Sequence, residues 1–242
     1  PSVAVGERIE VAPHFGPKDV QAHRLQGQAL NIRQPQGAPY FCAMAQESVM
    51  LGLKLPTDPR WVKLVEGNIS EILTDHAWCE QKAASNAIST IVRFPELTDL
   101  VEELTRIAQE EMEHFGMVVE KIKARGWTLG YERKDDYVGQ LSKIIKRGGS
   151  REAQLVDRLL FAAMIEARSC ERFKMLSERM DDPDLASFYR ELMISEAGHY
   201  TTFLKFARKY GNGIDVDARW QNFLDKEAEI MQGYSVKETM HG

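Results

Sequence analysis

Two short motifs with the same spacing combine a carboxylate with an imidazole. Glu111 and His114 are three positions apart in the chain, and so are Glu196 and His199. On a helix, residues three positions apart lie on one face, so both side chains of each motif would project in the same direction. Carboxylate and imidazole ligands suit iron or manganese. Each motif could therefore supply two ligands to a metal ion.

Each motif also has a glutamate partner at a matching distance upstream. Glu80 precedes Glu111 by 31 residues, and Glu166 precedes Glu196 by 30 residues. This distance fits a chain that runs to the end of one helix, makes a short turn and returns along the next helix to the same level of the bundle. One glutamate from each of two helices, with Glu-x-x-His from each of two others, is the pattern of di-iron and di-manganese bundles. The predicted metal ligands are Glu80, Glu111, His114, Glu166, Glu196 and His199.

A third Glu-x-x-His sequence, from Glu238 to His241, provides a comparison within the chain. The positions 31 and 30 residues before its glutamate are Ala207 and Arg208, so it has no carboxylate partner. It also lacks the surrounding apolar residues at helical spacing, or apolar stripe, that flank the other two motifs. The metal interpretation therefore rests on motif, partner and stripe together. Its alternative is a buried network of salt-bridged carboxylates without a metal ion.

The elements that must position these residues are four long segments with apolar residues at helical spacing. Each predicted ligand interrupts the apolar stripe of its segment, where a carboxylate is costly unless it is paired or binds a metal ion. A weaker pattern at about 216–232 predicts an additional C-terminal helix. The four long segments cover about residues 68–92, 95–125, 151–180 and 182–210.

The predicted fold is all-α, a ferritin-like four-helix bundle with one long crossover between its two helical hairpins. We expect a single domain over residues 1–242, with the core bundle at about 57–211. Residues 1–56 contain several prolines and glycines with little periodicity, which predicts an irregular N-terminal wrap with one short helix near 40–51. Thr57-Asp58-Pro59 is typical of a helix start.

Composition excludes several classes of protein. The chain has 43% hydrophobic and 28% charged residues, which is ordinary for a globular protein. No apolar run is long enough to span a membrane, and Pro1–Glu10 has no signal-peptide core, so we expect a cytoplasmic protein. The three cysteines form no Cys-x-x-Cys pair, which argues against a disulfide framework, a zinc ribbon or a rubredoxin-type iron site.

Charge is unevenly distributed along the chain. Residues 121–151 contain nine basic and three acidic residues, a balance of +6, whereas the whole chain has a net charge of −5. Such an asymmetry can mark a surface that contacts a polyanion such as nucleic acid, although charged runs are often only solvated faces. Within this window we predict Lys143, Lys146 and Arg147 to contact phosphates. His76, one helical turn before Glu80, is a candidate to hydrogen-bond a metal ligand.

The ligand motifs and their flanking residues resemble those of the tRNA 2-methylthio-isopentenyladenosine hydroxylases, a family of the ferritin-like di-iron carboxylate superfamily. The resemblance covers about residues 55–215, and all six ligand positions are filled. The residues that carry it are TDHAWCEQKAA (74–84), EEMEHF (110–115), EARSCERF (166–173) and SEAGHY (195–200).

This resemblance implies an enzyme that uses two iron ions and O2 to hydroxylate a terminal methyl of the isopentenyl group on a modified adenosine beside a tRNA anticodon. Manganese is the less favoured metal. An external reductase would supply electrons, since no flavin or nicotinamide fingerprint is visible. Base stacking could come from Trp127, Tyr131 or Tyr137. We expect a monomer or a small homo-oligomer.

Other functions share the same metal pattern. Bacterioferritin-like iron oxidation and storage uses it, but such chains are shorter and have no use for a basic crossover. A rubrerythrin-like peroxidase is disfavoured by the absence of Cys-x-x-Cys pairs. A small-molecule di-iron oxygenase or desaturase remains open, because a metal site does not encode its substrate. A helical interaction module with a buried polar network would bind no metal.

Overall fold

A computed structural model of the chain describes residues 50–233 and 239–240. The chain divides into two units, Pro1–Ala45 and Gln46–Gly242, and all described residues belong to the second. Most of the predicted helix near 40–51 and most of the predicted wrap over 1–56 lie outside the described residues, which begin with a single turn of 3-10 helix at Met50–Gly52. The wrap and the single-domain boundary therefore stay predictions.

All regular elements of the described residues are helical, which confirms the predicted fold class. The four long helices and the C-terminal helix lie within a few residues of the predicted ranges, and α1 begins directly after Pro59. No helix in the part of the chain that the structure describes is both long and apolar enough to cross a membrane. The elements are η1 (Met50–Gly52), α1 (Arg60–Gly67), α2 (Ile69–Arg93), α3 (Thr98–Ala124), α4 (Asp136–Leu141), η2 (Ser142–Ile144), α5 (Arg151–Arg179), α6 (Pro183–Tyr210) and α7 (Val216–Gln232).

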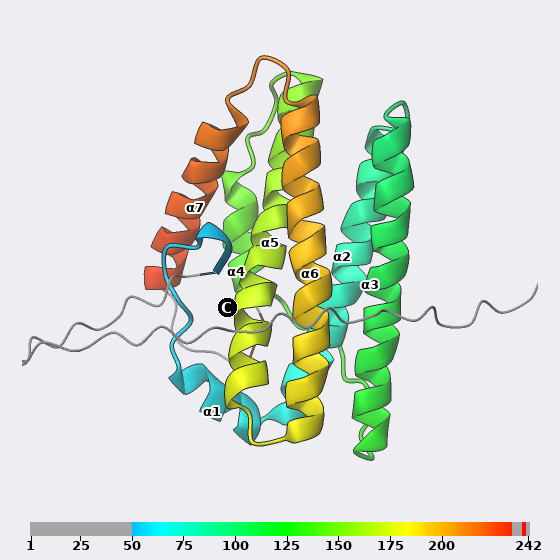
Figure 1. Ribbon diagram of the computed structural model, residues 1–242, viewed down its shortest axis with the longest axis vertical. Coiled ribbons are helices and arrows are strands. Elements are labelled where there is room, and N and C mark those ends of the chain that lie inside the picture. Colours follow the sequence, from blue (N-terminus) through cyan, green and yellow to red (C-terminus); the bar gives the residue numbers. More distant parts are fainter. Residues whose placement is uncertain (1–49, 234–238, 241–242) are drawn as a thin grey trace, which may run out of the picture. The chain divides into compact units, whose positions relative to one another are not determined.

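The long helices form two hairpins, as predicted. Helix α2 packs along α3, and α5 packs along α6 (Figure 1). The crossover between α3 and α5 holds α4 and η2, and α7 packs against both α4 and α5. Arg158 of α5 links the hairpins, because its guanidinium donates hydrogen bonds to Thr90 Oγ1 and Asn86 Oδ1 of α2.

Local capping fixes where the second hairpin's helices begin. The Ser150 hydroxyl accepts a hydrogen bond from the Ala153 amide at the start of α5. The Asp182 carboxylate accepts hydrogen bonds from two amides at the start of α6, where Pro183 occupies the first helical position. Both are favoured helix-start arrangements. They set the phase of α5 and α6, and hence the faces on which Glu166 and Glu196 lie.

Two apolar clusters fill the interior. On α2, α3 and α6 the predicted ligands lie in the sequence between residues of one cluster and residues of the other, whereas on α5 Ala163 and Ala167, on either side of Glu166, belong to the same cluster. One cluster includes Leu104 of α3 and Phe203 of α6. The other includes Leu73 of α2 and Phe173 of α5. Along α6, for example, the chain passes from the second cluster through the Glu196 motif into the first. The polar residues thus form a layer between two hydrophobic ones.

A second buried polar network fixes α7 to α5. The Arg168 guanidinium is completely buried and lies 2.5 Å from Glu227 Oε1 and 3.0 Å from Glu171 Oε2. The Tyr137 hydroxyl of α4 donates a further hydrogen bond to Glu227 Oε1. Breaking a buried pair by removing one partner is strongly destabilising, because it leaves an uncompensated charge.

We therefore expect Glu227→Gln to lower the free energy of unfolding by roughly 3 kcal/mol, since Arg168 would lose its nearest carboxylate. The matched control is Lys226→Ala on the same helix, which breaks only the exposed Lys226–Glu229 pair. That change should cost less than about 1 kcal/mol. Urea unfolding of the three proteins measures both effects, and equal losses for the two variants would contradict this account of the network.

Candidate metal centre

The six predicted ligands converge in the middle of the bundle. Each is buried, with at most 8% of its surface exposed. Their ligand atoms form two sets, and within each set the atoms lie within 4.8 Å of one another. The first set is Glu80, Glu111, His114 and Glu196, and the second is Glu111, Glu166, Glu196 and His199.

Glu111 and Glu196 belong to both sets. Each remaining residue belongs to one set only, so each set has one further glutamate and one histidine of its own. Two neighbouring cation positions that share carboxylates are the arrangement found in two-metal sites. The two hairpins contribute in the same way, since each supplies one shared glutamate and that glutamate is the first residue of a Glu-x-x-His motif.

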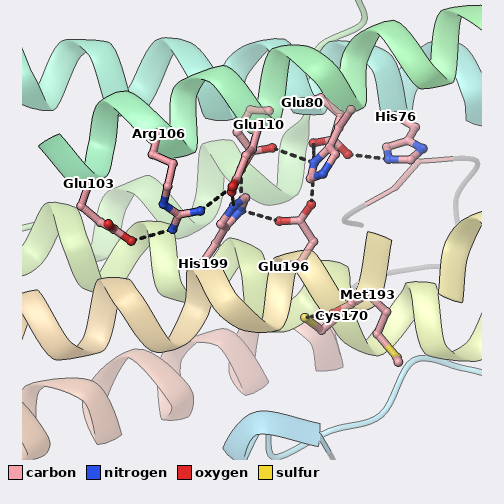
Figure 2. A network of polar contacts seen from close by, with 11 residues as sticks. His76, Glu80, Glu103, Arg106, Glu110, Cys170, Met193, Glu196 and His199 are labelled. Atoms are coloured by element: carbon pink, nitrogen blue, oxygen red, sulfur yellow. Dashed lines mark hydrogen bonds and ion pairs between the residues drawn. The ribbon is translucent and has the colours of Figure 1, made fainter. Parts of the chain in front are cut away.

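Both imidazoles turn the Nδ1 atom toward the shared carboxylates, and Figure 2 shows His199 beside Glu196. His199 Nδ1 lies 2.9 Å from Glu111 Oε1 and 3.0 Å from Glu196 Oε2. His114 Nδ1 lies 3.2 Å from Glu196 Oε1 and 3.8 Å from Glu80 Oε2. The same ring atom of both histidines therefore faces the space that the carboxylates surround.

Several of these close atoms make no hydrogen bond. Both carboxylate oxygens of Glu111, Nδ1 of His114 and Oε1 of Glu196 are buried without a hydrogen-bond partner. A buried polar atom left in this way costs roughly 1–3 kcal/mol, and more when it is charged. Metal ions accept electron pairs from just these atom types. The donor set therefore fits a pair of cations.

The electrostatics of the cluster call for positive charge. Burial, reinforced by the charge of Glu196, raises the pKa of Glu111 to about 8. Burial also raises the pKa of Glu166 well above its usual range. Although burial opposes it, the adjacent carboxylates of Glu111 and Glu196 raise the pKa values of His114 and His199 to about 12. The clustered carboxylates therefore favour positive charge in their midst, which a bound cation would supply.

Two residues around the cluster hold its members in place. His76 Nε2 lies 2.6 Å from Glu80 Oε1, and the His76 ring stacks against Tyr189. On the other side, Glu110 Oε2 lies 2.8 Å from His199 Nε2, the nitrogen that faces away from the cluster (Figure 2). Arg106, in turn, forms an ion pair with Glu110. Partners of this kind fix the ring orientation and tautomer of ligating residues.

His76 was a candidate from the sequence, whereas Glu110 was not. His76 lies one turn from Glu80 on the same helix, so spacing alone suggested the contact. Glu110 contacts a residue on a different helix, 89 positions away. Nothing in the sequence around Glu110 indicates that partner.

The residues predicted to contact phosphates lie apart from the metal cluster. Lys143, Lys146 and Arg147 are all exposed. Lys143 and Lys146 line an open surface cleft together with Arg219 and Lys226 of α7. None of the six predicted ligands lines this cleft.

The three aromatic candidates differ in exposure. Tyr131 is 96% exposed and Trp127 is 38% exposed. Tyr137 is completely buried, and its hydroxyl donates to Glu227. The suggestion that Tyr137 stacks on a base is therefore wrong, because its ring is buried and its hydroxyl is bonded to α7.

The fold and the clustered residues define a class, the ferritin-like carboxylate bundles. A solved structure titled "Protein 43 with aldehyde deformylating oxygenase activity from Synechococcus" superposes on this chain with a TM-score of 0.72 and 32% identity. The match covers 78% of this chain and 95% of that one. This similarity, together with the all-helical architecture, confirms the predicted fold class.

Within this class, the sequence matches one particular family. Residues 44–242 match the model of the tRNA-(MS[2]IO[6]A)-hydroxylase (MiaE) family, and the chain belongs to that family. Two relatives carry the name tRNA 2-(methylsulfanyl)-N(6)-isopentenyladenosine(37) hydroxylase. The one from Pseudomonas putida is 36% identical over 74% of this chain and 86% of its own length. The one from Salmonella typhimurium is 27% identical over 74% of this chain and 83% of its own length.

Proposed function

We propose that the six clustered residues hold two iron ions, with Glu111 and Glu196 as shared ligands, and that the chain hydroxylates the isopentenyl group of a modified adenosine in tRNA. The observation that carries the proposal is the overlap of two four-residue ligand sets at two buried glutamates. Family membership supplies the substrate class. It also favours hydroxylation over iron storage or a small-molecule reaction.

The reaction inserts one oxygen atom of O2 into a C–H bond of a terminal methyl group. The other oxygen atom leaves as water, which requires two electrons and two protons. An iron pair supplies the redox chemistry with O2. In this proposal the electrons come from an external reductase and the protein acts in the cytoplasm, with a tRNA substrate as support for that location.

The protein itself holds the metal ligands, orients them and shields the reacting atoms from water. His76 and Glu110 orient Glu80 and His199 through the contacts described above. The apolar clusters on either side of the polar layer exclude bulk water from the reacting atoms. The exposed side chains of Lys143, Lys146 and Arg147 contact tRNA phosphates, and exposed Tyr131 is placed to stack on a base.

Metal content of ligand variants tests the shared-ligand arrangement. The wild-type protein should bind about two iron ions per chain after anaerobic loading with Fe(II). Glu111→Ala should lose both ions, because it belongs to both sets, whereas Glu80→Ala should retain one. Glu113→Ala, an exposed change between Glu111 and His114, is the matched control and should retain two. Elemental analysis that finds Glu111→Ala and Glu80→Ala alike would argue against sharing.

Nucleoside analysis tests the reaction itself. The iron-loaded protein, a chemical reductant and O2 should convert the prenylated adenosine of tRNA to a product heavier by one oxygen atom. Mass spectrometry of digested tRNA measures the conversion, and iron-free protein serves as the control. Rapid oxidation of excess Fe(II) without any change in the tRNA would instead support the storage function.

Charge reversal tests the predicted phosphate contacts. Changing Lys143, Lys146 and Arg147 to glutamate should weaken tRNA binding and lower its salt dependence, with a log–log slope reduced by up to about three. Iron content should not change, because none of the three is near the cluster. The control reverses three exposed basic residues outside the window, Lys174, Arg179 and Lys205. Equal weakening by both triple variants would show that only net charge matters.

A further inference from the structure

A mostly apolar pocket between α2 and α5 reaches one of the six clustered residues. Glu166 lines the pocket directly. The cavity has a volume of about 70 Å³, which is below the range of drug-sized binding sites and leaves room only for a small group. Its apolar walls come from Ala83 of α2, Val138 of α4, Phe161, Ala162 and Ile165 of α5, and Phe203 of α6.

The polar lining of the pocket connects it to the crossover. Lys82 lines the pocket and forms an ion pair with Glu132, whose neighbour in the chain is the exposed Tyr131. Asp135 also lines the pocket and caps α4 by accepting a hydrogen bond from the Val138 amide. The crossover therefore supplies part of the wall through Val138, and part of the polar lining through Asp135.

We propose that this pocket binds the isopentenyl tail of the substrate, with the nucleoside held at the crossover beside Tyr131. The inference rests on the proposed function and adds the position of the substrate. A branched five-carbon tail offers no hydrogen-bonding group, so only apolar burial can bind it, and these walls provide that burial. A tail in the pocket ends near Glu166, where its terminal methyl groups adjoin the cluster.

The size of the pocket depends on small side chains. Ala83 is half-buried and faces the pocket from α2, so a larger residue there fills the pocket without crowding the core. Val138, also half-buried, faces the pocket from the crossover side. Ala83→Leu and Val138→Phe thus remove the same space from two different elements, and neither residue belongs to the metal cluster.

Binding of two RNA hairpins to the full, iron-loaded chain without O2 tests the proposal. The hairpins are one anticodon stem-loop with the prenylated adenosine and the same stem-loop with unmodified adenosine. Wild-type protein should bind the prenylated hairpin at least about tenfold more tightly, because the tail buries several carbons. Ala83→Leu and Val138→Phe should remove this preference and leave binding of the unmodified hairpin unchanged.

The control is Ala186→Leu, which enlarges a half-buried alanine of α6 outside the pocket and should retain the preference. If both pocket variants keep the wild-type preference, the tail binds elsewhere, while the proposed function stands. A wild-type protein that binds both hairpins equally also overturns the pocket. If the wild-type protein binds neither hairpin and does not hydroxylate tRNA, the proposed function fails as well.

Discussion

The burial of four glutamates and two histidines at one level of the bundle is the constraint on which the rest of the structure depends. Carboxylates are expensive to bury, and these lie within a few ångströms of one another. Several of the oxygen and nitrogen atoms of these residues make no hydrogen bond. Two cations sharing Glu111 and Glu196, as we propose, would satisfy those atoms and balance the charge together.

The surrounding helices and caps keep this layer of glutamates and histidines in place. Two apolar clusters hold the four long helices together on either side, so the polar layer need not supply the stability of the fold. Helix caps at Ser150 and Asp182 set the phase of α5 and α6. Arg158 ties α5 to α2, and the Arg168–Glu227 pair ties α7 to α5. The ligands thus rest on rigid helices rather than on loops.

Much of this could be predicted from the sequence, because it follows from regular spacing. Helical periodicity located the long helices, and Ser150 and Pro183 marked two of their starts. The separation of Glu80 from Glu111, and of Glu166 from Glu196, predicted that the four would lie at one depth. The structure brings all of them together with both histidines.

Other features could not be predicted, because they depend on contacts between elements distant in the chain. The contact of Glu110 with His199 crosses from α3 to α6. Arg168 interrupts no apolar stripe of the bundle; it is buried because α7 covers a second face of α5. Tyr137 belongs to a short helix in a glycine-containing, basic segment, where its burial against α7 gave no periodic signal.

The most direct measurement of the central claim is anomalous X-ray diffraction from crystals of the iron-loaded protein. We expect two iron peaks roughly 3.5–4 Å apart, both within bonding distance of Glu111 and Glu196. One peak would contradict it, as would two peaks that share neither glutamate.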